Sequence, residues 1–228
     1  MSAYPRIIAH RCGGALAPEN SLAGLAVSVR LGCRAVEFDV MLTADGVPIL
    51  MHDETLERTT HCTGRVVDCT FAEIRACTAS VPTLVEALAE CRRLGLWVNI
   101  ELKPAVGYET ETGAVVGRWL VEYWDGRGVV SSFSEKSALA ARQLLPSAVF
   151  ALLCERLPDD WQDQVARLQA RSVHLAAADV DARTAQALGT IPWACYTVND
   201  RSAAARLAQL GCSAVFTDHP DLWLPAEM

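Results

Sequence analysis

Short apolar segments rich in β-branched residues alternate along this chain with longer amphipathic segments, and this alternation limits the possible folds more than any other feature. Their lengths and periods are those of β-strands and α-helices. We predict eight strands, at residues 6–10, 35–40, 96–102, 129–133, 148–153, 172–175, 193–198 and 214–217. We predict helices between them, at residues 21–31, 83–94, 110–124, 135–145, 159–170, 181–188 and 200–210. This α/β pattern is typical of the (β/α)₈ TIM barrel, and an open doubly wound sheet is the alternative.

Side chains near the ends of the predicted helices support these boundaries. Asn20 is expected to cap the first helix, because an asparagine side chain can accept a hydrogen bond from a free N–H group at a helix start. Thr83 and Glu86 have the spacing of a capping box. Asp200 can cap the last helix and Gly211 can end it. The helical interpretation therefore agrees with the local start and stop signals.

Residues 43–81 do not fit the alternation, and we interpret them as a small insertion after the second strand. The turn Asp45-Gly46 leads into a returning apolar strand that ends near His52. A hairpin loop with an even number of residues places His52 on the same face as Glu37 and Asp39, whereas a three-residue loop places it on the other face. We predict an even-length loop, with His52 facing the two acids.

Length and composition indicate one large globular domain, 1–228, with the insertion inside it. A net charge of −7 argues against nucleic acid as a partner, because phosphate backbones bind cationic surfaces. The chain has no long apolar run and no signal-peptide pattern at its start, so we expect a cytoplasmic protein without stable membrane association. Nine cysteines without metal-binding spacing are then expected to be reduced thiols.

Acidic side chains lie near the carboxyl ends of two predicted strands. Alternation along the strand at 35–40 places its valines and phenylalanine toward the helices, and Glu37 and Asp39 toward the barrel interior. The strand at 96–102 points Glu101 inward in the same way, and Lys103 follows. Barrel enzymes have their active sites at this end of the strands. We therefore predict a functional site there.

Three carboxylates that point into one space repel each other and call for a cation. Oxygen ligands of this kind suit hard divalent ions, Mg²⁺ or Ca²⁺. The alternative is that Lys103 neutralises the acids in a purely structural ion-pair cluster.

Several short motifs occur along the chain in the order of a known family. They are His10-Arg11, Ala17-Pro-Glu-Asn-Ser21, Val36-Glu-Phe-Asp-Val40, Asp45-Gly46 with His52-Asp53, Leu56-Glu-Arg-Thr59, Pro82-Thr-Leu-Val-Glu86, Ile100-Glu-Leu-Lys103, Ser131-Ser-Phe133, Tyr196-Thr-Val-Asn199 and Phe216-Thr-Asp218. Each motif alone is weak, but the ordered set spans about residues 4–221 and is specific. The chain resembles the glycerophosphodiester phosphodiesterase family, and in particular its compact cytosolic bacterial members.

The resemblance implies a TIM barrel with an insertion after the second strand, and it implies a role for each matching residue. These are metal ligation by Glu37, Asp39 and Glu101, acid–base catalysis by His10 and His52, phosphate binding by Arg11 and Lys103, and outer contacts by Glu19, which holds Arg11, and Asn20. The implied reaction is metal-dependent hydrolysis of a small glycerophosphodiester, such as glycerophosphocholine or glycerophosphoethanolamine, to glycerol 3-phosphate and an alcohol.

One residue departs from the family pattern. Cys12 stands where the family usually has glycine, which tolerates backbone conformations that cysteine does not. A thiol beside the site could act as a sensor, but sensors need exposure and a cationic setting. We interpret Cys12 as a filling side chain.

Two other functions are compatible with parts of the sequence. A related barrel phosphodiesterase or lyase that acts on lysophospholipids would need an apolar lip, and the polar insertion offers no obvious one. A non-catalytic phosphodiester-binding protein would be indicated by loss of a histidine or an acid, and none is lost. The residues do not decide which histidine is the acid, whether water attacks directly or a cyclic phosphate forms first, or the oligomeric state.

Overall fold

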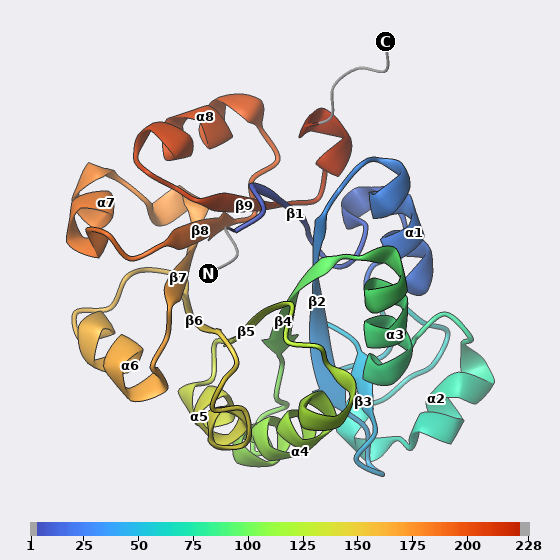
Figure 1. Cartoon of the computed structure of the whole chain (residues 1–228). Helices are drawn as coiled ribbons and strands as arrows, with labels where there is room; N and C mark the ends of the chain where they lie inside the picture. The colour runs from blue at the N-terminus through green and yellow to red at the C-terminus, as the bar shows by residue number, and fades with distance from the viewer. Residues whose placement is uncertain (1–3, 224–228) are drawn as a thin grey trace.

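The computed structural model describes residues 4–223, and its central feature is a closed barrel of parallel strands (Figure 1). The barrel strands are β1 (Ile7–Ala9), β2 (Ala35–Leu42), β4 (Trp97–Leu102), β5 (Gly128–Ser132), β6 (Phe150–Cys154), β7 (Ser172–Ala176), β8 (Trp193–Tyr196) and β9 (Ala214–Thr217). Strand β1 pairs with both β9 and β2, which closes the ring. The fold is therefore a TIM barrel, and the open-sheet alternative is wrong.

Helices surround this ring of strands (Figure 1). They are α1 (Leu22–Arg30), α3 (Leu84–Leu94), α4 (Glu109–Tyr123), α5 (Glu135–Leu144), α6 (Trp161–Leu168), α7 (Ala182–Leu188) and α8 (Arg201–Gln209). Each lies within two residues of the range predicted from the sequence. The capping box of Thr83 and Glu86 and the Asp200 cap are both confirmed, because the Thr83 and Asp200 side chains accept from Glu86 N–H and Ala203 N–H.

The predicted cap of α1 is wrong. Ser21, not Asn20, is the N-cap residue, and its hydroxyl oxygen accepts a hydrogen bond from Gly24 N–H at 3.1 Å. Asn20 has a φ of 52° and is buried, and its side chain turns toward β2. The helix start is therefore one residue later than expected, which frees the asparagine amide for the barrel mouth.

The two faces of the strands build two separate apolar cores. Val36, Phe38 and Val98 belong to the large core between strands and helices. Ala35 and Trp97 belong to a smaller cluster inside the barrel, with the aromatic ring of Tyr4 packed against Trp97. The alternation predicted for β2 and β4 therefore holds, and the next inward positions of each strand reach the carboxyl end of the barrel.

The insertion follows β2 and contains more regular structure than expected. It holds β3 (Pro48–Leu50), the short 3₁₀ turn η2 (Val66–Asp68) and α2 (Phe71–Cys77). The polar composition of this stretch concealed α2, although Thr70 and Glu73 form a capping box at its start. The insertion packs its own apolar cluster against the barrel end of β2.

The hairpin register corrects the sequence interpretation. Val40 pairs with Leu50 and Leu42 with Pro48, so paired residue numbers sum to 90 and the loop has odd length. Continued alternation would turn His52 away from the acids. Strand β3 ends at Leu50, however, and the chain bends at residues 52–54, so the position of His52 does not follow the pleat of the strand.

The expectation that all cysteines are reduced thiols is wrong for one pair. Cys62 and Cys77 form a disulfide within the insertion, with their Cα atoms 5.9 Å apart. The sequence does not predict this pair, because its spacing matches no metal or redox motif and only the folded insertion brings the two residues together. Within residues 4–223, none of the helices has the length and apolar character needed to cross a membrane.

Candidate active site

Three carboxylates meet at the carboxyl end of the barrel. Glu37 and Asp39 on β2 and Glu101 on β4 each direct an oxygen into one space, and these three atoms lie within 4.8 Å of one another. Asp39 and Glu101 are directly paired in the parallel ladder of β2 and β4, so these two inward-facing side chains lie next to each other. Glu37 and Asp39 are only 2% and 1% exposed, so this negative charge is not relieved by bulk water.

The cluster lacks the partners that buried carboxylates require. Among the described residues, Glu37 Oε1 and Glu101 Oε1 accept no hydrogen bond. Burial, with repulsion from Asp39, raises the pKa of Glu37 and raises that of Glu101 to about 8. Lys103 Nζ is 3.4 Å from Glu101 Oε1, an ion pair without an aligned hydrogen bond. The orphaned oxygens fit a divalent cation, which would supply the missing ligand contacts.

His10 follows β1 and is held by an acid from β9's end. Its Nδ1 donates to Asp218 Oδ1 at 2.7 Å, and Asn199 Nδ2 donates to the other oxygen of Asp218 at 2.9 Å. The His10 hydrogen bond is the largest cause that lowers the pKa of Asp218, to about 2. The free Nε2 of His10 lies 3.9 Å from Glu37 Oε2. A carboxylate at Nδ1 thus orients the imidazole so that Nε2 faces the site.

His52 is oriented in the same way from the insertion side. Its Nδ1 donates to Asp53 Oδ1 at 2.6 Å, and its Nε2 accepts from Lys103 Nζ at 3.2 Å. Lys103 in turn pairs with Glu101. The acidic cluster therefore lies between His10, beside Glu37, and His52, beside Lys103.

Arg11 joins the site from the loop after β1. Its backbone N–H donates to Glu37 Oε2 at 2.8 Å, its Nη1 donates to Glu19 at 3.2 Å, and its Nε lies 3.8 Å from Asp39 Oδ2. Asn20 Nδ2 donates to Asp39 Oδ2 at 2.9 Å. Glu19 and Asn20 thus both contact residues that line the acidic space, and Glu19 holds Arg11 as expected.

The loop at Cys12 shows why glycine is usual there. Cys12 has a φ of 74°, in the left-handed region that favours glycine. Its side chain is fully buried, and burial raises the pKa of the thiol. A Cβ atom on Gly24 would lie 3.0 Å from the Cys12 Cβ atom, so the glycine of α1 leaves room for the cysteine. The side chain fills space and is not placed as a sensor.

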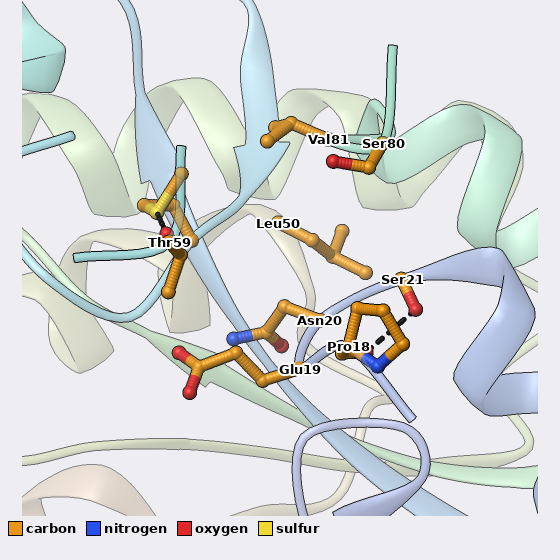
Figure 2. Close-up of a pocket in the computed structure, with 9 residues that line it drawn as sticks. Pro18, Glu19, Asn20, Ser21, Leu50, Thr59, Ser80 and Val81 are labelled. Carbon is orange, nitrogen blue, oxygen red and sulfur yellow. Dashed lines mark hydrogen bonds between the residues drawn. The ribbon is translucent and has the colours of Figure 1, made fainter. Parts of the chain in front are cut away.

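Two cavities adjoin these residues. A small one of about 30 Å³ enters the barrel and is lined by His10, Glu37, Glu101, Phe133 and Tyr196, among others. A larger one of about 250 Å³ lies beside the mouth, between the insertion and the loop that precedes α1 (Figure 2). Two polar side chains of the second cavity bond within its lining, Ser21 to Pro18 O and Thr59 to Met51 Sδ, whereas Glu19 bonds to Arg11 and Arg58 outside it.

The fold also brings to the site three charged residues without a predicted role, Asp53, Asp218 and Arg58. Asp53 contacts its chain neighbour His52, whereas Asp218 and Arg58 contact residues from distant segments. The His-Asp dipeptide at 52–53 was a usable signal for the first of them. No local signal connects Asp218 to His10, because the contact exists only once the barrel closes.

Comparisons with known proteins agree with this geometry. A model of the Glycerophosphoryl diester phosphodiesterase family matches residues 10–222. A solved structure from Oleispira antarctica, a phosphodiesterase in complex with the product sn-glycerol-3-phosphate, superposes with a TM-score of 0.91 at 31% identity and covers 96% of this chain and 94% of its own.

Two further relatives have similar extent. A glycerophosphodiester phosphodiesterase from Caldanaerobacter subterraneus is 28% identical over 233 residues, 94% of each chain. The crystal structure of an Agrobacterium tumefaciens glycerophosphodiester phosphodiesterase is 27% identical with a TM-score of 0.74, over 96% of this chain and 99% of that one. The family match covers nearly the whole chain, and so this protein belongs to the glycerophosphoryl diester phosphodiesterase family.

Proposed function

We propose that this protein hydrolyses small glycerophosphodiesters, such as glycerophosphocholine or glycerophosphoethanolamine, to glycerol 3-phosphate and an alcohol. The observation that carries the proposal is the pair of imidazoles, each held at Nδ1 by a carboxylate, on either side of an acidic cluster with orphaned oxygens. A phosphodiester needs a proton at its leaving alkoxide and a nucleophile that loses one, and two imidazoles suit both tasks near neutral pH.

A divalent ion, Mg²⁺ or Ca²⁺, would be held by Glu37, Asp39 and Glu101. When bound, such an ion stabilises negative charge on phosphate oxygens as a Lewis acid. The buried carboxylate oxygens without partners support this assignment better than a purely structural ion-pair cluster. Among the described residues, Glu37 Oε1 and Glu101 Oε1 accept no hydrogen bond even though Lys103 Nζ lies 3.4 Å from Glu101 Oε1.

The remaining cations would bind the substrate phosphate. Arg11 and Lys103 lie at the rim of the acidic space, and guanidinium and ammonium groups form short, charge-assisted hydrogen bonds to phosphate oxygens. Glu19 orients Arg11, and Asn20 orients Asp39. His10 and His52, with their Nε2 atoms toward the site, would move the two protons.

One assay tests the proposal. Purified protein is incubated with glycerophosphocholine, with and without a chelator, and release of glycerol 3-phosphate is measured. We expect turnover that stops on chelation and returns with Mg²⁺ or Ca²⁺. No release of glycerol 3-phosphate from any small glycerophosphodiester, with metal supplied, would contradict the function.

The histidine roles are tested in the same assay. His10→Ala and His52→Ala should each lower kcat by roughly 10²–10⁴-fold, with a smaller change in KM, because each group acts on a proton in the transition state. His61→Ala, which removes an exposed histidine of the insertion, is the matched control and should keep wild-type kcat. A wild-type kcat in either test variant, with an alkyl alcohol as leaving group, would remove that histidine from the mechanism.

We propose a cytoplasmic protein whose single domain, 1–228, includes the insertion, and whose substrate reaches it as a dissolved small molecule. Cell fractionation with antibody detection tests the location. A thiol count on the purified protein tests whether Cys62 and Cys77 are bonded to each other.

A further inference from the structure

Arg58 belongs to the insertion, yet its guanidinium contacts carboxylates from two separate parts of the candidate site. We propose that Arg58 is a positioning residue that holds the His52–Asp53 pair at a fixed place relative to Glu19 and Arg11. The inference rests on the acid–base role proposed for His52. It assigns a task to a side chain that neither ligates metal nor binds phosphate in that proposal.

Both edges of the guanidinium are used. Its Nε donates to Asp53 Oδ2 and its Nη2 to Asp53 Oδ1 at 3.0 Å, while Nη1 and Nη2 donate to Glu19 at 2.8 and 2.7 Å. Asp53 accepts from His52 Nδ1, and Glu19 accepts from Arg11 Nη1. A planar fork sets angles as well as distances. Arg58 therefore connects the imidazole of His52, through Asp53, to Arg11, the residue that we propose binds the substrate phosphate.

Apolar packing does not set this relation by itself. The cavity of about 250 Å³ separates the insertion from the loop before α1. Figure 2 shows Thr59, the neighbour of Arg58 in the chain, across this space from Pro18 and Ser21, with Glu19 at its edge. Where two segments face each other over a cavity, their spacing depends on directional contacts. The pair of Arg58 with Glu19 is such a contact.

The segment that carries Arg58 is itself well fixed. Leu56 N–H donates to Gly64 O at 3.0 Å, which closes residues 56–64 into a compact loop. The disulfide between Cys62 and Cys77 joins this loop to α2. Arg58 thus lies in a segment that a hydrogen bond and a disulfide hold in place, and its own hydrogen bonds can therefore fix the positions of Asp53 and Glu19.

Arg58 reaches the imidazole through Asp53. The groups that face His52 are Asp53 in its own segment and Lys103 at the end of β4, with Glu101 beyond Lys103. The Arg58 hydrogen bonds are the largest cause that lowers the pKa of Asp53. Loss of the guanidinium would leave Asp53, the acceptor of the His52 Nδ1 hydrogen bond, without the contact that fixes its direction relative to Glu19.

The test compares Arg58→Gln, Arg58→Lys and Arg65→Gln in the metal-loaded enzyme with glycerophosphocholine. Arg65 is the matched control, because it lies in the same insertion, is similarly exposed (43% against 48%) and pairs with Glu54. We expect Arg58→Gln to lower kcat by about 10–100-fold, the usual effect of removing an orienting partner. Arg58→Lys should recover part of that loss, and Arg65→Gln should leave kcat unchanged.

A second readout does not depend on turnover. The His52 ring is followed by NMR through its imidazole nitrogen signals at fixed pH, with His52→Ala used to assign them. We expect these signals to shift in Arg58→Gln, because Asp53 loses its fixed direction, and to stay in place in Arg65→Gln. If the wild type hydrolyses no glycerophosphodiester, the proposed function fails, but these signals still decide the positioning role.

Three results would overturn the inference. One is a kcat and His52 imidazole signals that are all unchanged in Arg58→Gln. Another is a loss of kcat without any shift of the His52 signals, which would show that Arg58 acts on a group other than His52. The third is a KM increase that depends on the alcohol of the substrate at constant kcat, which would make Arg58 a direct substrate contact.

Discussion

At the scale of single residues, the site is built from side chains that orient other side chains. His10 and His52 come from unrelated segments, yet a carboxylate fixes each at Nδ1 and leaves Nε2 toward the acidic cluster. Asp218 is held in turn by Asn199. The histidines, the acids and Arg11 were identifiable from the sequence because they lie in motifs at strand ends. Asp218 was not, because its role depends on which strand end lies beside β1.

Asp218→Asn tests whether Asp218 orients His10. An amide cannot hold the imidazole in the same tautomer with the same charge support, so we expect kcat to fall by about 10²–10⁴-fold. Because the pKa of Asp218 is lowered to about 2, its carboxylate stays charged over the working pH range. Asp221→Asn, an exposed acid three residues later, is the control, and equal kcat in the two variants would contradict the orienting role.

The metal site is tested by Glu37→Gln, read by calorimetric titration with Mg²⁺ and Ca²⁺. We expect weaker ion binding at an unchanged or higher melting temperature, because the substitution also removes a buried charge that repels Asp39. The Glu109→Gln variant, at the half-buried first residue of α4, is the control and should bind the ion as the wild type does. Wild-type affinity in Glu37→Gln would exclude this carboxylate as a ligand.

At the scale of elements, the hairpin of β2 and β3 shows that side-chain alternation predicts the direction of a residue only inside a paired strand. Alternation correctly placed Glu37, Asp39 and Glu101, because β2 and β4 are long, paired strands with one face in the barrel. The same argument failed for His52, since β3 stops at Leu50 and the histidine lies in the bend after it. Helix α2 was missed because its capping signal lies in a polar segment without a clear apolar period.

One glycine inserted after Asp45 tests the corrected hairpin. The turn is exposed and Gly46 has open space around it, so the longer loop can bulge outward while Val40 stays paired with Leu50. We expect kcat within about twofold of the wild type, as surface loops tolerate insertions. One glycine inserted between Met51 and His52 is the contrasting variant and should abolish turnover. A large loss of kcat in the first variant at normal thermal stability would instead show that the length of the hairpin loop sets the direction of His52.

At the scale of the whole molecule, barrel closure and the insertion act together. Closure brings the ends of β1, β2, β4 and β9 to one rim, and the insertion adds His52 and Arg58 to that rim from outside. The insertion has its own small core around Met41, Ile49 and Ile74 and a covalent link of its own. The stability of the insertion therefore affects the positions of His52 and Arg58.

The Cys62→Ser, Cys77→Ser double variant tests that link. A disulfide that closes a loop of 15 residues contributes about 3 kcal/mol by restricting the unfolded chain. We expect the double variant, or the reduced wild type, to unfold at lower temperature. Cys69→Ser, at a half-buried free thiol of the same insertion, is the control. Identical melting of the double variant and the wild type, with the bond confirmed by mass spectrometry, would show that it adds no stability.

The amino-acid sequence by itself determined the order of strands and helices, the barrel and the inward direction of Glu37, Asp39 and Glu101, because local periodicity encodes which face of an element is buried. The tertiary structure alone decided the hairpin register, the Cys62–Cys77 bond and the contacts of Asp218 and Arg58. These depend on groups far apart in the chain, and their partners become neighbours only when the ring of strands closes and the insertion packs against it.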